Sequence, residues 1–233
     1  MRSNLAANLA ALSVLAFGSS PSLANDASHP TVVELYQSQG CSSCPPAIAN
    51  INAIATRPDI LALTFSVTYW DQLGWKDTFA KAEFTRRQWD FAHAAGHVNV
   101  ATPQTIINGR VFTNGGDDGQ LVTAIRAADR GSKGPTIKAL DGKLLVGAAP
   151  VSGAATIWLV RYDARVLNVP IRAGENGGRT IAHRNVVRSL SAIGTWRGDE
   201  TAVPLPSSRD PNLRSAILVQ SGTGGPIIAA AKL

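Results

Sequence analysis

Two cysteines, Cys41 and Cys44, are the residues of this chain best suited to do chemistry, and the chain has no others. They stand in the order C-S-S-C. Two cysteines three apart can form a disulfide and reopen it: the first attacks a partner and the second resolves the mixed disulfide. So short a loop adds little chain-entropy stabilisation when it is closed. Thiol–disulfide exchange is therefore the main prediction, and an inert structural disulfide is the alternative.

The pair lies between a predicted strand and a predicted helix. Residues 31–36 are β-branched and apolar, which indicates a buried strand, and residues 47–55 place apolar side chains on one helical face. A helix start leaves backbone N–H groups unpaired and lowers the pKa of a nearby thiol. We therefore expect Cys41 to be the nucleophile, with its sulfur open to solvent, and Cys44 to be the resolving thiol.

The first half of the chain continues with alternating strands and helices. Residues 60–67 form an apolar run typical of a strand covered on both faces. An aromatic loop over 68–77 leads to a predicted helix over 78–95, capped by Asp77 or Thr78 and ended by Gly96. In this helix Glu83 should face Arg87, and Phe84 and Phe91 should share the apolar face.

Residues 102–128 add a hairpin and a last helix. Asn108-Gly109, flanked by the short apolar runs 104–107 and 110–113, is a strong hairpin pattern. Asp117-Asp118 then caps a predicted helix that ends at Ala128. The predicted order is β-α-β-α-β-β-α, in which the first two strands are parallel.

Beyond a Gly- and Pro-containing boundary at 131–135 the pattern changes to strands. Asp141-Gly142 predicts a hairpin, and residues 174–178 predict a glycine-rich hairpin loop before a strand over 180–187. His183 falls in this strand, as a hydrogen-bonded or surface residue. The fold class is thus α/β, with a domain over 25–134 and a β-rich half over 135–233. That half is either a small sandwich or an extension packed on the first half.

The first 24 residues predict a secretory signal peptide. Arg2 precedes an apolar run over 5–17, and small residues lead to a cleavage point after Ala24. The run is too short for a membrane span, so we expect no stable membrane anchor after cleavage. The expected location is the periplasm or the exterior.

The charge and the remaining motifs narrow the function. The formal net charge is +6, but the basic residues are scattered, so nucleic acid is not an expected partner. The chain lacks a phosphate-binding loop or paired-carboxylate pattern, and no cofactor is expected. A metal site of Cys41 and Cys44 with His93 and His97 is disfavoured, because 48 residues separate Cys44 from His93.

This order of elements resembles thioredoxin, with Thr102-Pro103 where that fold places a cis-proline. Three blocks, V-V-E-L-Y-Q-S-Q-G-C-S-S-C-P-P-A, Y-W-D-Q-L-G-W-K-D-T-F and T-P-Q-T-I-I-N-G-R, are similar to an exported bacterial thioredoxin-like family, domain of unknown function 1223. G-E-N-G-G-R-T and N-V-V-R in the second half are similar to it as well. The resemblance implies a thioredoxin-like βαβαββα domain, and Pro103 beside the substrate backbone. It implies no particular activity.

The resemblance also points to three further side chains. Glu34 is the candidate proton acceptor for the resolving thiol, although it stands one residue further from Cys41 than is usual. The alternative is a strand-edge or salt-bridged carboxylate. Trp70 and Trp75 are a candidate substrate wall, and the alternative is a small core beneath the loop.

The sequence thus predicts an exported thiol–disulfide oxidoreductase that exchanges disulfides with thiols or disulfides of a protein or peptide. The alternative is a redox-inactive thioredoxin-like binding module with a static Cys41–Cys44 disulfide.

Overall fold

The computed structural model describes residues 27–233, so the predicted signal peptide lies outside the described residues. Three helices are described: α1 (Pro45–Ile54), α2 (Ala82–Ala94) and α3 (Asp118–Ala127). The strands of the first half are β1 (Thr31–Gln37), β2 (Ile60–Ser66), β3 (Gln104–Ile107) and β4 (Val111–Thr113). Those of the second half are β5 (Ile137–Leu140), β6 (Lys143–Val146), β7 (Ala155–Asp163), β8 (Leu167–Pro170), β9 (Thr180–His183), β10 (Val186–Trp196), β11 (Thr201–Pro204), β12 (Leu213–Ser221) and β13 (Ile227–Lys232).

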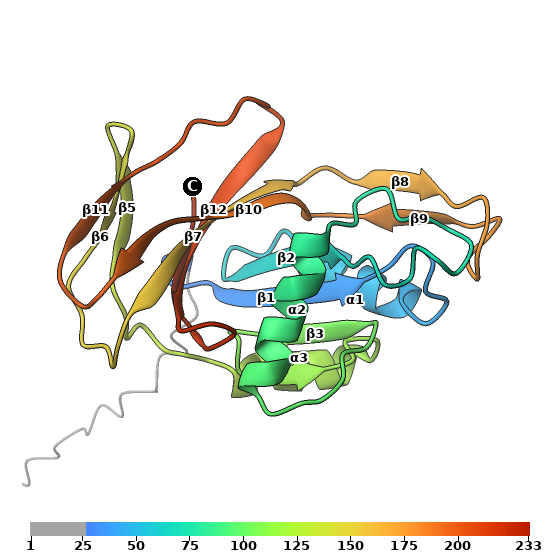
Figure 1. The fold of residues 1–233 in the computed structure, drawn as a ribbon, viewed down its shortest axis with the longest axis horizontal. Helices are drawn as coiled ribbons and strands as arrows, with labels where there is room; N and C mark the ends of the chain where they lie inside the picture. The colour runs from blue at the N-terminus through green and yellow to red at the C-terminus, as the bar shows by residue number, and fades with distance from the viewer. Residues whose placement is uncertain (1–26) are drawn as a thin grey trace, which may run out of the picture.

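The described chain is a mixed α/β fold around one central sheet (Figure 1). The sheet has eight strands in the order β13-β12-β7-β10-β2-β1-β3-β4. In the first half the predicted order of elements is observed: β1 and β2 are parallel, and β3 is antiparallel to both β1 and β4. The predicted hairpin turns at Asn108 and Gly109, both with positive φ. Asp117 caps α3 by accepting a hydrogen bond from the Gln120 N–H.

Helices cover both faces of the first half of the sheet, which is why β1 and β2 are buried along their whole length. On one face α1 and α3 pack against β1 through Val33 and Leu35, and both cysteines belong to this cluster. On the other face α2 packs through Phe84 and Phe91. Since side chains alternate along a strand, odd positions of β1 face the cysteines and even positions face α2.

The second half extends the first instead of forming a separate sandwich. β10 joins β2 through the pairing of Val186 with Thr64, and β7, β12 and β13 continue the same sheet outward. The three-stranded sheet β11-β6-β5 covers these strands around the buried Trp196. The remaining ribbon, β8 with β9, runs back along α1 and the loop over 67–81 (Figure 1).

Several local predictions were wrong. Helix α2 begins at Ala82, not at residue 78, because Asp77 turns inward and accepts a hydrogen bond from the Phe79 N–H. The expected strand over 180–187 is two strands, divided at Asn185, whose φ is +50°. His183 is fully buried and neither ring nitrogen has a hydrogen-bond partner, so it is neither a surface nor a hydrogen-bonded residue.

Candidate functional site

The two cysteines lie where β1 gives way to α1. Cys44 is the residue before the first turn of the helix, and Pro45 and Pro46 occupy the positions where a missing N–H is tolerated. Both cysteines are free thiols. Their exposed fractions are 0%, so the expectation that the Cys41 sulfur is open to solvent was wrong. The intervening Ser42 and Ser43 are exposed, and Cys41 therefore lies directly beneath the surface.

Cys41 is surrounded by hydrogen-bonding groups. Its Sγ lies 3.2 Å from Ser43 Oγ and 3.7 Å from the carbonyl oxygen of Thr102. The Thr102–Pro103 peptide bond is cis, as predicted. The contacts of the Thr102 carbonyl oxygen with Cys41 and Ser43 place the neighbouring Pro103 beside the cysteine loop. The pKa of Cys41 is lowered to about 6, chiefly by the hydrogen bond from the Cys44 thiol. The Ser43 and Thr102 side chains and the Ser43 N–H contribute less, and burial opposes the shift.

Cys44 has the opposite character. Burial raises the pKa of its thiol far above the usual range, and the neighbouring Cys41 raises it further. One thiol is thus poised to ionise while the other keeps its proton and donates a hydrogen bond. This pairing can provide a nucleophile and a second thiol to resolve a mixed disulfide.

Glu34 does not lie with the cysteines. It is an even position of β1 and points to the α2 face, where both of its oxygens accept hydrogen bonds from Arg87, at 2.9 and 2.7 Å. The Tyr36 hydroxyl donates a third hydrogen bond at 2.6 Å. The salt-bridged alternative is therefore the one observed, and the predicted Glu83–Arg87 pair is replaced by this buried one. The geometry gives no support to Glu34 as a proton acceptor for Cys44.

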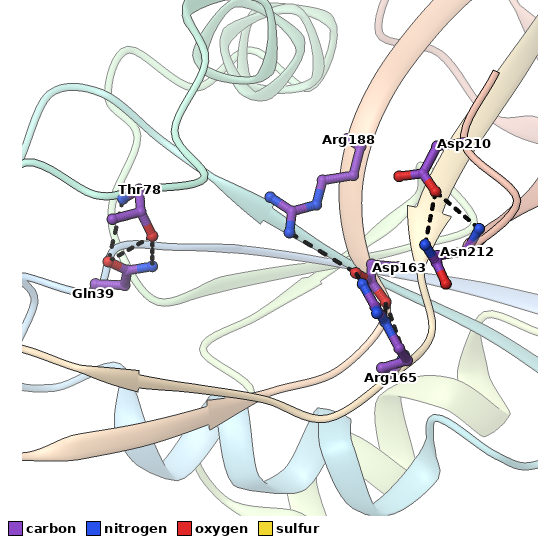
Figure 2. Close-up of polar contacts among 7 residues, drawn as sticks. All are labelled: Gln39, Thr78, Asp163, Arg165, Arg188, Asp210 and Asn212. Atoms are coloured by element: carbon purple, nitrogen blue, oxygen red, sulfur yellow. Dashed lines mark hydrogen bonds and ion pairs between the residues drawn. The ribbon is translucent and has the colours of Figure 1, made fainter. Parts of the chain in front are cut away.

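Trp70 and Trp75 are both half-buried and pack against the cluster that holds the cysteines, which matches the alternative of a small core under the loop. The Trp75 indole N–H donates to Gln39 Oε1 at 2.9 Å. Figure 2 shows Gln39 hydrogen-bonded to Thr78 as well, while Asp163 is held by Arg165 and Arg188 elsewhere in the fold.

Asp77 completes the link between the aromatic loop and the cysteine loop. Its Oδ2 accepts a hydrogen bond from the Gln39 N–H at 2.8 Å. Burial raises the pKa of Asp77 to about 6. The sequence indicated only a helix cap here, because the polarity of an aspartate does not reveal that it is buried.

The glycine-rich turn over 174–178 reaches the cysteine loop from the second half. Glu175 Oε2 accepts hydrogen bonds from the Ser42 N–H at 3.0 Å and from the Ser42 hydroxyl at 2.7 Å. The amide of Asn176, a fully buried residue, donates to the carbonyl oxygens of Gln39 and Cys41 at 2.9 and 2.7 Å. The prediction of a hairpin loop was confirmed, but no local pattern indicated that the loop contacts residues more than 130 positions away.

An open groove lies on the other side of Pro103. It has a volume of about 300 Å³ and is lined by Ala101, Pro103, Gln104, Phe112, Thr113 and Asn114. Two of the lining residues are held by Gln88, whose amide donates to the Ala101 carbonyl oxygen and to Gln104 Oε1. The Tyr69 hydroxyl in turn donates to Gln88 Oε1. This groove offers space for a polypeptide segment directly beside the cysteine loop.

The two histidines considered for a metal site lie apart from the cysteines. His93 stacks near Trp89, and His97 lies against Phe112 beyond the end of α2. In the part of the chain that the structure describes, no three His, Cys, Asp or Glu side chains gather in a metal-binding arrangement. Within residues 27–233 no helix is both long enough and apolar enough to cross a membrane.

Comparison with protein-family models identifies the family of this chain. The model of the family described as "Protein of unknown function (DUF1223)" matches residues 32–220. The chain belongs to this family. The DUF1223 match includes both the cysteine loop and the turn over 174–178, so the contact between Ser42 and Glu175 lies within the matched residues.

Two solved structures are similar to this DUF1223 chain. The crystal structure of protein AGR_C_4864 from Agrobacterium tumefaciens is 30% identical, with a TM-score of 0.71 over 87% of this chain and 93% of that one. HBP35 of Porphyromonas gingivalis is 9% identical, with a TM-score of 0.59 over 88% of this chain and 75% of that one, a likeness of fold alone. Among curated proteins there is no match.

Proposed function

We propose that this protein is an exported thiol–disulfide oxidoreductase with a thioredoxin-like first half. The observation that carries the proposal is the asymmetry of the pair: Cys41 has a pKa near 6 beside cis Thr102–Pro103, and Cys44 is a buried, protonated thiol next to it. A structural pair has no need of one stabilised thiolate. The order and pairing of β1, α1, β2, α2, β3, β4 and α3 support the thioredoxin-like assignment.

The reaction needs only the two sulfurs and a partner disulfide. The Cys41 thiolate attacks one partner sulfur, forming a mixed disulfide while the partner S–S bond breaks and a partner thiolate leaves. Cys44 then loses its proton to the departing thiolate and attacks the Cys41 sulfur, which releases the second partner thiolate. Two electrons pass to the partner, and the Cys41–Cys44 disulfide remains; with the pair oxidised, the same steps run in reverse.

The burial of Cys41 sets a condition on this mechanism. Because its exposed fraction is 0%, a partner sulfur reaches Cys41 only after the covering residues move. The cover is thin, since Ser42 and Ser43 are exposed and the groove beside Pro103 is open. We therefore assign the partner to an extended protein or peptide segment that lies in this groove and displaces the Ser43 hydroxyl from Cys41.

Export belongs to the same proposal. The apolar N-terminal run with its small-residue cleavage point directs the chain to the periplasm or the exterior, where thiol–disulfide exchange is a common need. No cofactor takes part in the scheme, because the two cysteine sulfurs of the chain supply both electrons.

Exchange with a model disulfide tests the proposal. Reduced wild-type protein should reduce an oxidised peptide faster than the matched variants Cys41→Ser and Cys44→Ser, which differ from it by one sulfur each. Cys44→Ser should also retain the peptide as a mixed disulfide on Cys41. Equal rates for wild type and Cys41→Ser would overturn the proposal.

The complete burial of both cysteines favours one other function, a binding module in which the pair is inert. On that account Cys41→Ser leaves capture of the partner intact, and substitution of Trp70 or Trp75 abolishes it. The same exchange assay separates the two, because an inert pair gives no sulfur-dependent rate.

A further inference from the structure

The cysteine loop is held by two consecutive residues from the second half of the chain. Asn176 Nδ2 donates to the Cys41 carbonyl oxygen at 2.7 Å, and Glu175 Oε2 accepts from the Ser42 N–H at 3.0 Å. These two groups are opposite ends of the single peptide unit between Cys41 and Ser42. Hydrogen bonds at both ends of this planar unit restrict the backbone rotations on either side of it, and hence the direction in which the Cys41 side chain points.

The same turn is itself well anchored. Asn176 donates a second hydrogen bond to the Gln39 carbonyl oxygen, so it spans Gly40, and it accepts one from Arg179. Gly174, with φ of +73°, lies so close to Trp75 that an added Cβ would stand 3.1 Å from the Trp75 Cβ. The turn is therefore wedged between the aromatic loop and the cysteine loop, at the end of the β8–β9 ribbon seen in Figure 1.

We propose that Glu175 and Asn176 form a clamp that keeps the Cys41 sulfur buried, so that the β-rich half controls access to the reactive thiol. This inference rests on the proposed function and assigns a role to the β8–β9 ribbon. The two clamp residues differ in burial: Asn176 is fully buried, whereas Glu175 is exposed. The hydrogen bonds between Glu175 and Ser42 can therefore break without disturbing the core.

The Glu175 contacts are charge-assisted, which makes them strong for an exposed group. The Ser42 hydroxyl and N–H lower the pKa of Glu175, so the carboxylate stays ionised at neutral pH. Glutamine at this position keeps an oxygen that can accept both hydrogen bonds, whereas alanine keeps none. Comparison of Glu175→Gln with Glu175→Ala therefore shows whether access to Cys41 depends on these hydrogen bonds.

Alkylation of Cys41 by iodoacetamide at a pH well above its pKa tests the clamp, because the thiol is then fully ionised and the rate reports access only. We expect Glu175→Ala and Asn176→Ala to raise this plateau rate by about five- to tenfold, as for the loss of one or two hydrogen bonds from an opening equilibrium. Glu175→Gln should remain within about twofold of wild type.

A variant that lowers stability elsewhere provides the control. Leu144→Ala leaves a cavity in the separate cluster around Trp196, which contains neither cysteine, and should leave the plateau rate unchanged. The inference is overturned if Glu175→Ala alkylates at the wild-type rate, or if Leu144→Ala accelerates alkylation as much as Glu175→Ala does. Alkylation needs no disulfide partner, so a failure of exchange by wild type would contradict the proposed function and leave this result intact.

Discussion

Replacing one partner of the buried Glu34–Arg87 pair should destabilise the fold strongly without changing the chemistry of the cysteines. The two side chains are 1% and 5% exposed, and they meet through two hydrogen bonds at 2.7 and 2.9 Å. Tyr36 donates to the carboxylate, and Arg87 donates to Gln220 and stacks 4.9 Å from the Phe91 ring centre. The two charges are therefore fully paired and almost completely buried.

The magnitude follows from what remains after a substitution. In Glu34→Gln the guanidinium keeps its charge and loses its counter-ion, which for a buried pair costs about 3–5 kcal/mol. For a chain of this size each kcal/mol lowers Tm by about 2–4 °C, so Tm should fall by roughly 6–20 °C. The double variant Glu34→Met/Arg87→Met removes both charges and should recover most of this loss.

Urea unfolding, followed by tryptophan fluorescence, measures the stability of wild type, Glu34→Gln, Arg87→Met and the double variant. The same samples are assayed for disulfide exchange and for the pH dependence of Cys41 alkylation. We expect large stability losses in the single variants and wild-type alkylation midpoints in all folded ones. Our assignment would be refuted by a Glu34→Gln protein of wild-type stability in which the Cys44 resolving step is slowed, because Glu34 would then act as its proton acceptor.

Three further substitutions test other parts of the structure. Cys44→Ala removes the hydrogen bond that lowers the pKa of Cys41 most, so the alkylation midpoint should move upward from about pH 6 and mixed disulfides should accumulate; an unchanged midpoint contradicts this. Asn108→Ala, at a residue with φ of +47° whose amide bonds the Val32 N–H and the Ala128 carbonyl, should cost about 2–4 kcal/mol in urea unfolding, and a loss below about 0.5 kcal/mol argues against it. Burial lowers the pKa of His183 to about 4, from about 6.5 in the unfolded chain, so the folded protein is fully stable above pH 6.5 and loses stability as the pH falls towards 4. His183→Phe should remove up to about 3 kcal/mol of that loss, as measured by urea unfolding at several pH values. An identical dependence of stability on pH in the variant would contradict the burial of His183.

Local patterns were sufficient to predict much of the first half. Asn108-Gly109 and Asp141-Gly142 turn with positive φ where their types indicated, and Asp117 caps its helix. These features depend on neighbouring residues alone, so one sequence reveals them. The place of the cysteines at the start of α1 was predictable for the same reason. So was the burial of Phe84 and Phe91 on the apolar face of α2.

Features that depend on distant parts of the chain were not predictable. Arg87 has a suitable partner four residues away in Glu83, but it pairs instead with Glu34, which the fold brings from β1. The contacts of Glu175 and Asn176 with the cysteine loop span more than 130 residues, and they arise because the β8–β9 ribbon folds back along α1. In the proposed clamp the burial of Cys41 depends on these same long-range contacts, so a pattern that suggested a reactive pair could not show that its first cysteine is covered.

The most direct test of the central claim, that Cys41 is the nucleophile of an exchanging pair, is the pH dependence of its alkylation in the reduced protein. Mass spectrometry of the modified peptide assigns the reaction to Cys41 and separates it from any reaction at Cys44. The account predicts a midpoint near pH 6, with Cys44 unmodified throughout the range in which the protein stays folded. A midpoint near the ordinary cysteine value of about 8.5, or modification of both cysteines only when the protein unfolds, would contradict it.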